Sequence, residues 1–141
     1  MHSQRIVLGG LLVVVALAVG CGGPVNVQGK VLRDGKPVSE ATVVFIPVSG
    51  GQEAGDLTDE GGHFRLKNPQ KFGVVPGEYL VTVSKMVYPP GMKPPTPQEM
   101  TMALTSKMKE SLPLQYTTQD KTPLRVTVPR GGVTDVILEI K

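Results

Sequence analysis

The sequence predicts an all-β protein folded as a β-sandwich of about seven strands. Three observations lead to this fold class. Glycine and proline are frequent, with 17 and 13 copies among 141 residues. The valine-rich runs are short, and most of them alternate apolar with polar residues, which is the pattern of a half-buried strand. Signals for tight turns separate one run from the next.

The segment before the predicted sandwich is an apolar run that ends at Cys21, the only cysteine. A single arginine, Arg5, precedes residues 6–19, which carry no charge. This run is too short for a comfortable transmembrane helix, which needs about 20 residues. A basic start followed by such a run is typical of a secretory signal. We therefore expect the protein to be exported.

The end of this segment, Leu-Ala-Val-Gly-Cys at 17–21, resembles the bacterial lipoprotein signal. The resemblance implies that residues 1–20 are a signal peptide, cleaved between Gly20 and Cys21, and that the Cys21 thiol carries diacylglycerol. A lone cysteine without a disulfide partner agrees with this assignment. Ala18 stands where that signal usually has leucine, so an ordinary secreted protein with a free Cys21 is the alternative. The expected location is the cell envelope, with the lipid holding the protein on a membrane.

The chain after the predicted signal divides into a tether and one domain. Residues 21–24 form the tether, which at about 3.3–3.6 Å per residue spans only on the order of 10–15 Å. Residues 25–141 form the domain, within which residues 86–111 are an insertion. Loss of Arg5 with the signal lowers the formal net charge from +3 to +2, and the other basic residues are scattered. Nucleic acid is therefore not an expected partner.

The first predicted strands are joined by a tight turn. Residues 25–32 alternate, with their valines on one face, and this pattern predicts a half-buried strand. Asp34 and Gly35 follow as an Asp-Gly pair, which is a strong hairpin signal. Residues 41–47 are almost continuously apolar, so we expect both faces of that strand to be covered.

A second turn lies in the middle of the domain. Thr58 precedes the turn at residues 59–62, which is rich in acidic residues and glycine. Threonine and aspartate side chains can bond backbone amides, and glycine can adopt a positive φ, so these residues favour a tight turn. In the strand that follows, Phe64 and Leu66 are expected to point inward.

The remaining predicted strands also follow turn signals. Pro76 and Gly77 lead into a strand at residues 79–85 whose alternate residues are apolar. Alternation returns at residues 124–128, and a glycine-rich turn then leads into a last strand at residues 136–140. Both segments predict half-buried strands that complete the sandwich.

The insertion at residues 86–111 interrupts the strand pattern. It contains five prolines and all five methionines that follow the signal. The tetrapeptide at 96–99 matches a capping box with proline at the first helical position, which predicts a short helix over residues 97–110. Its apolar residues have the i, i+4, i+8 spacing of a packing stripe, namely Met100, Leu104 and Met108.

Three motifs occur in order along the domain: a segment from Gly29 through Asp34-Gly35 to Phe45, the heptapeptide Thr-Asp-Glu-Gly-Gly-His-Phe at 58–64, and Pro-Gly-Glu-Tyr at 76–79. Together they resemble carboxypeptidase regulatory-like domains, which have a transthyretin-like Greek-key sandwich. The resemblance covers residues 27–85, and the rest of the domain looks like small bacterial envelope lipoproteins built on it. It implies structural roles for Asp34, Gly35, Thr58, Asp59, Gly62, Phe64, Pro76, Gly77 and Tyr79. It implies no particular activity, because one fold serves many functions.

An enzymatic relative with this fold is the transthyretin-like hydroxyisourate hydrolase, which uses paired histidines, an arginine and a C-terminal Tyr-Arg-Gly-Ser sequence. After its signal this chain has one histidine, His63, and it ends in Leu-Glu-Ile-Lys. The required acid–base pair is missing. We therefore expect neither enzymatic activity nor a cofactor.

Two metal-binding alternatives stay open at this point. Thioether ligands favour Cu(I) in an exported protein, and Met100 and Met102 are the candidates, although a packing stripe explains most of these methionines. Carboxylates favour Ca²⁺, although turn formation explains them as well; the candidates are Glu53, Asp56, Asp59 and Glu60.

The sequence as a whole predicts a lipid-anchored cell-envelope protein that acts as a non-enzymatic structural or protein-binding module. The expected partners are a membrane, through the N-terminal lipid, and an envelope protein. The short tether predicts that the insertion at 86–111 is presented to that protein close to the membrane.

Overall fold

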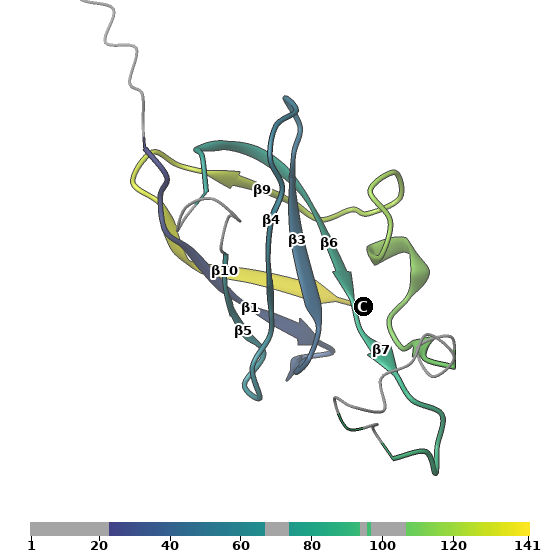
Figure 1. Cartoon of the computed structure of the whole chain (residues 1–141). Helices are drawn as coiled ribbons and strands as arrows, with labels where there is room; N and C mark the ends of the chain where they lie inside the picture. Colours follow the sequence, from purple (N-terminus) through teal and green to yellow (C-terminus); the bar gives the residue numbers. More distant parts are fainter. Residues whose placement is uncertain (1–22, 67–73, 94–95, 97–106) are drawn as a thin grey trace, which may run out of the picture.

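Two β-sheets pack face to face in the computed structural model, which describes residues 23–66, 74–93, 96 and 107–141 (Figure 1). In the β1 sheet, β1 (Val27–Arg33) pairs in parallel with β10 (Val133–Ile140) and antiparallel with β2 (Lys36–Pro37) and β5 (His63–Arg65). The β6 sheet is antiparallel, in the order β4 (Ala54–Leu57), β3 (Thr42–Pro47), β6 (Gly77–Ser84) and β9 (Arg125–Val128). The other elements are the pair β7 (Met86–Val87) and β8 (Lys109–Glu110) and the short 3-10 helix η1 (Leu114–Tyr116).

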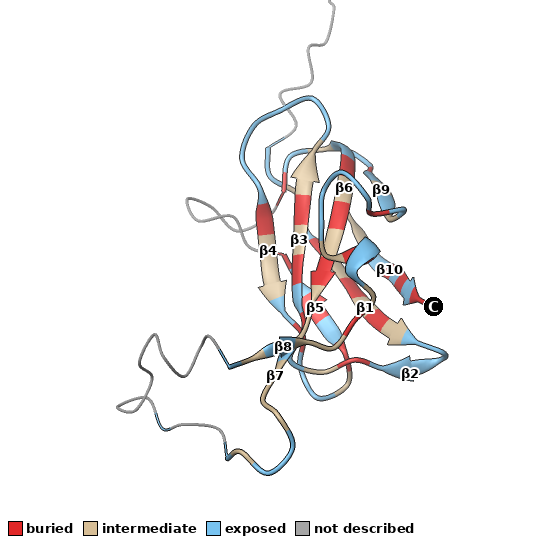
Figure 2. Cartoon of the chain, turned by 90° about the vertical axis from the view of Figure 1, so that its right-hand side faces the viewer, coloured by how far each residue is buried: buried red, intermediate tan, exposed pale blue. Residues whose placement is uncertain are grey.

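The all-β class predicted from the sequence is confirmed. The described residues contain ten strands, of which β2, β7 and β8 have two residues each. The seven longer strands form the two facing sheets together with the two-residue strand β2, and they correspond to the expected short strands. Buried and exposed positions alternate along them, as Figure 2 shows by its red bands.

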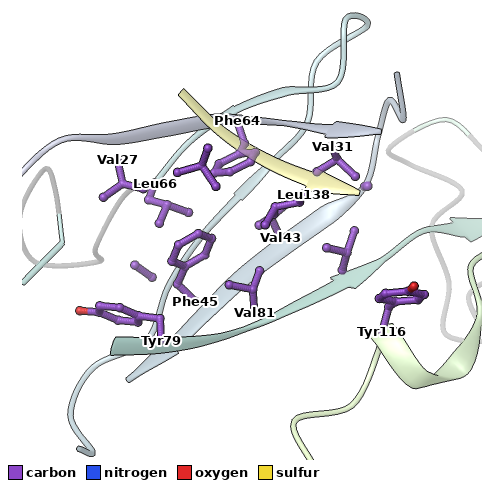
Figure 3. Close-up of a cluster of buried hydrophobic side chains, with 14 of the residues drawn as sticks. Val27, Val31, Val43, Phe45, Phe64, Leu66, Tyr79, Val81, Tyr116 and Leu138 are labelled. Atoms are coloured by element: carbon purple, nitrogen blue, oxygen red, sulfur yellow. The ribbon is translucent and has the colours of Figure 1, made fainter. Parts of the chain in front are cut away.

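The core lies between the sheets and is built from the inward residues of this alternation (Figure 3). Phe64 and Leu66 point inward as predicted and are 3% and 2% exposed. Phe45 in the β6 sheet is fully buried, and its ring centroid lies 6.0 Å from that of Phe64 in the β1 sheet and 5.9 Å from that of Tyr79. Tilted aromatic pairs at this separation add to the stabilisation from burial alone.

Strand β3 differs from the prediction that both of its faces are covered. Val43 and Phe45 are buried, but Val44 and Ile46 are only partly buried and Thr42 is exposed. The reason is that β3 belongs to one of two facing sheets, so the core covers only its inner face. A continuous apolar run does not by itself distinguish this case from a strand that is buried on both sides.

The predicted helix over residues 97–110 is wrong at its C-terminal end. Lys109 and Glu110 form strand β8, which pairs antiparallel with Val87 and Met86. This pairing extends the backbone where the helix was expected to continue, because the insertion closes on itself at its base. The segment 97–106, which contains most of the methionine stripe, lies outside the described residues.

Different parts of the chain occupy the two ends of the sandwich (Figure 1). At the tether end, Val25 and Val74 exchange two backbone hydrogen bonds of 2.8 Å, near the loop at 48–53 and the turn at 129–132. At the insertion end lie the β1–β2 turn at 34–35 and the β7–β8 pair. Strand β6 runs from the tether end to the insertion end. With about 3.3 Å per residue, its length separates the two ends by about 25 Å.

Candidate functional site

The base of the insertion is a small closed structure at the insertion end. The chain leaves β6 after Ser84, forms β7 and returns through β8, with Val87 opposite Lys109. Ser111 then fixes the returning chain, because its backbone N–H and its Oγ both donate to the Lys85 carbonyl, at 2.9 and 3.0 Å. The two ends of the insertion are therefore held side by side on the rim of the sandwich.

The side chain of Glu110 joins the two ends of the insertion more directly. Its Oε2 accepts a hydrogen bond of 2.5 Å from Ser84 Oγ. Its Oε1 accepts from the backbone N–H groups of Lys85 and Leu112, at 2.8 and 3.0 Å. One carboxylate thus bonds the last residue of β6, the residue after it and the residue that leads back into the core. We call this arrangement the Glu110 clasp.

The clasp lowers the pKa of Glu110. Partial burial raises the pKa of this carboxyl, but the hydrogen bonds from Ser84 Oγ and from nearby backbone N–H groups lower it by more. These donors favour the charged form, so the pKa in the folded protein lies below its ordinary value. The stability that the clasp contributes is present above the pKa of an unfolded chain and is lost as the pH falls through the lowered pKa.

Replacing Glu110 with glutamine should loosen the base of the insertion, because the neutral amide accepts hydrogen bonds more weakly than a carboxylate. We expect a local loss of about 1 kcal/mol, which corresponds to about fivefold faster hydrogen exchange at the Lys85 and Leu112 amides. Amide exchange followed by NMR at neutral pH measures this change, and the difference from wild type should shrink as wild-type Glu110 becomes protonated. Glu139→Gln, at an exposed position of β10, is the matched control. Unchanged exchange at both amides would contradict the role of the clasp.

A groove of about 460 Å³ lies beside the clasp, between the β1–β2 hairpin and the base of the insertion. Three of its lining side chains are cationic: Arg33, Lys36 and Lys85. Four are apolar: Pro37, Val38, Val87 and Leu112. Arg33 spans the groove, because its Nη1 donates to the Ser111 carbonyl at 2.9 Å. We call this feature the cationic groove.

Two smaller hollows of about 220 Å³ each occur elsewhere in the described residues. One lies at the tether end and is lined largely by the glycine-containing loop at 48–53 and the residues that precede β6. The other lies on the outer face of the β1 sheet, next to His63 and Ile137. Neither brings several charges of one sign together, so the cationic groove is the stronger binding candidate.

The turn residues singled out in the sequence have structural roles. Asp59 Oδ1 accepts from the backbone N–H groups of Gly61 and His63, at 2.9 Å each. The bond from the His63 N–H is the main cause of a lowered pKa at Asp59. Gly62 has a φ of 77°, and a Cβ there would lie 2.7 Å from the Val31 carbonyl oxygen. This turn therefore needs glycine at position 62 for two reasons.

The other two motifs are also explained by local structure. Asp34 and Gly35 have φ values of 50° and 78°, which fit the two-residue hairpin turn between β1 and β2. Pro76 precedes Gly77, the first residue of β6. Tyr79 is 3% exposed, burial raises the pKa of its hydroxyl, and that hydroxyl donates to the Val75 carbonyl at 2.6 Å.

The candidate calcium ligands are not brought together. Asp56 accepts from the Arg65 backbone N–H at 2.8 Å, and Asp59 serves its own turn, also contacting the His63 ring at 3.3 Å. Within the part of the chain that the structure describes, no group of three or more histidine, cysteine, aspartate or glutamate residues could hold a metal ion. The candidate copper ligands Met100 and Met102 lie outside the described residues, as do Gly20 and Cys21.

Sequence reasoning missed the clasp and the groove. The sequence predicts a helix at Glu110, and no sequence motif assigns a binding role to Arg33 or Lys36. The local signal for the clasp is Ser84, a polar residue at the end of the alternating strand β6. Its partner Glu110 lies 26 positions later in the sequence. Such a separation gives no pattern that a sequence reveals.

Comparisons with protein-family models, with curated proteins and with solved structures found no match. Among the described residues, no helix has the length and apolar character that crossing a membrane requires.

Proposed function

We propose that this protein is a lipid-anchored cell-envelope module that binds another protein at its insertion end. It acts without catalysis and without a cofactor. The finer fold assignment, a transthyretin-like Greek-key sandwich of the carboxypeptidase regulatory-like kind, belongs to the same proposal. Its support is that the turn motifs on which the resemblance rests have the structural roles that the resemblance implies.

The observation that carries the binding role is the construction of the insertion end. The Glu110 clasp and Ser111 fix both ends of an insertion rich in proline and methionine. Holding a segment at both ends lowers the conformational entropy that it loses when it binds a partner. Methionine is an adaptable contact residue. A base fixed by hydrogen bonds beside a charged groove is suited to docking a partner.

The tether end supports the anchored part of the proposal. Val48 and Val75 are large apolar residues on this end, and they are 50% and 57% exposed. Gly23 and Pro24, next to the proposed lipid attachment, are exposed as well. Exposed valines beside a short tether would lie close to the bilayer, where apolar side chains are favoured.

The fold changes one part of the mechanism expected from the sequence. The base of the insertion lies about 25 Å from the tether end, as estimated from the length of β6, so it is not beside the anchor. We infer that the sandwich acts as a spacer that presents the insertion away from the anchor.

The two halves of the proposal can be tested separately. Fatty-acid labelling of Cys21 tests the anchor, and photo-cross-linking from Val87 in intact cells tests the binding end. We expect label on the wild type and protein adducts from Val87.

A histidine-based activity is not supported by the surroundings of His63. Its side chain is 60% exposed, and within the described part of the chain its ring has one polar partner, the turn residue Asp59. A catalytic histidine needs a second group positioned to use its proton. The described residues around this turn provide backbone contacts instead.

A further inference from the structure

We propose that the cationic groove binds an acidic, extended segment of the partner protein. This inference rests on the proposed function and deepens it by giving the chemistry of the partner. The cations of the groove come from both sheets: Arg33 and Lys36 from the β1–β2 hairpin, and Lys85 from the residue after β6. Lys85 lines the same groove as Arg33 and Lys36, although about 50 positions in the sequence separate it from them.

The charges on the β1–β2 hairpin are arranged unfavourably in the free protein. Arg33 and Lys36 are direct partners across the β1–β2 hairpin, so their side chains project from the same face. Like charges placed opposite each other repel and destabilise an antiparallel pair. A carboxylate bound in the groove would lie between these two cations and remove the repulsion. The hairpin is therefore better suited to the complex than to the free protein.

No salt bridge among the described residues neutralises a cation of the groove. The two ion pairs within the described ranges are His63–Asp59 and Arg125–Glu78, and neither involves a groove residue. Asp34 is the one acidic residue in the lining, so three cations and one carboxylate leave a charge of +2. The nearby Glu110 carboxylate is committed to the clasp.

The lining of the groove also favours one kind of anion. The apolar part of the lining, which we call the floor, includes the buried residues Val38 and Leu112, and we call the exposed cations Arg33 and Lys36 the rim. Its volume of about 460 Å³ lies in the usual range of ligand sites, about 300–1,000 Å³. A segment that alternates carboxylates with apolar side chains would match both the rim and the floor. A small inorganic anion would leave the apolar floor exposed to water.

Two other polyanions fit less well. The lining contains no aromatic side chain, so a nucleic-acid base would have no ring on which to stack. The groove lies at the end opposite the tether, about 25 Å away by the length of β6. Attraction to anionic lipids is screened over about 8 Å at physiological ionic strength, so the membrane that holds the anchor does not reach the groove.

The test uses the full chain in a non-ionic detergent and two labelled eight-residue peptides, one alternating glutamate with valine and one alternating glutamine with valine. Fluorescence anisotropy measures their binding. We expect the glutamate peptide to bind more tightly, with affinity that falls as salt is added. Lys36→Gln and Lys85→Gln should each weaken it about two- to fivefold. Lys30→Gln, on the outer face of β1, is the matched control and should leave binding unchanged.

Equal binding of the two peptides would overturn the proposal, as would binding that both groove substitutions leave unchanged. Anionic phospholipid added to the detergent micelles would also overturn it, and would assign the groove to a membrane, if it competes for the same residues with higher affinity. The proposed function fails in a different way. If a partner is cross-linked in cells from Val87 with a yield that Lys36→Gln and Lys85→Gln do not alter, the binding role stands and the acidic-segment proposal is wrong.

Discussion

Replacing Thr58 with valine should lower the free energy of unfolding by about 2–4 kcal/mol, because two buried backbone groups lose their partner. Thr58 is 3% exposed. Its hydroxyl accepts from the Ala41 N–H at 2.9 Å and donates to the Val38 carbonyl at 2.7 Å. Valine preserves the shape of the side chain but offers neither bond. Denaturant unfolding of the full chain measures the loss.

Thr58→Ser is the matched control for this substitution. Serine keeps the hydroxyl and removes one methyl group, which costs about 0.8 kcal/mol when the group is buried. The hydrogen-bond account therefore requires valine to be clearly worse than serine, although valine is the better space-filler. If serine is as destabilising as valine, the lost methyl group matters as much as the two hydrogen bonds, and the role given to the Thr58 hydroxyl is incorrect.

Replacing Cys21 with alanine should abolish labelling of the protein by an alkyne fatty acid supplied to growing cells. The proposed diacylglycerol is attached through the Cys21 thiol, and alanine has no atom that could carry it. Two or three acyl chains, at about 0.8 kcal/mol per buried methylene, give stable membrane anchoring. The wild type should therefore sediment with membranes and carry label, which gel fluorescence after conjugation of a dye would detect.

Gly23→Ala is a suitable control for the Cys21 substitution, because a Cβ at position 23 has no heavy atom within 4 Å, and this variant should be labelled like the wild type. The alternative of an ordinary secreted protein predicts a different result. It requires that the wild type takes up no fatty acid and that the Cys21 thiol of the mature protein reacts with a maleimide. That pair of results would remove the anchor from the proposed function.

The sheets were largely predictable because their signals are local. Alternation along β1 and β6 assigned the inward valines correctly, and the Asp-Gly pair at 34–35 located the first hairpin. The turn after Thr58 was predictable for the same reason, since Asp59 bonds amides two and four residues away. Local hydrogen bonding leaves a compositional trace that a sequence can reveal.

The features at the insertion end were not predictable because they join distant positions. Arg33 and Ser111 are 78 residues apart, and Ser84 and Glu110 are 26 apart. The spacing of the methionines predicts a helix up to Glu110. Lys109 and Glu110 form a strand instead, because they pair with Val87 and Met86 from the start of the insertion. The parallel pairing of β1 with β10 has no local signature either, because these are the first and last strands in the sequence.

We propose that the insertion end contacts another protein while the tether end faces the membrane. This arrangement is tested by placing a photo-reactive amino acid at Val87, which lines the cationic groove, or at Val48, which is 50% exposed at the tether end. After irradiation of intact cells, we expect Val87 to give discrete protein adducts that Val48 does not give. No adduct from Val87, or the same adducts from both positions, would contradict the claim.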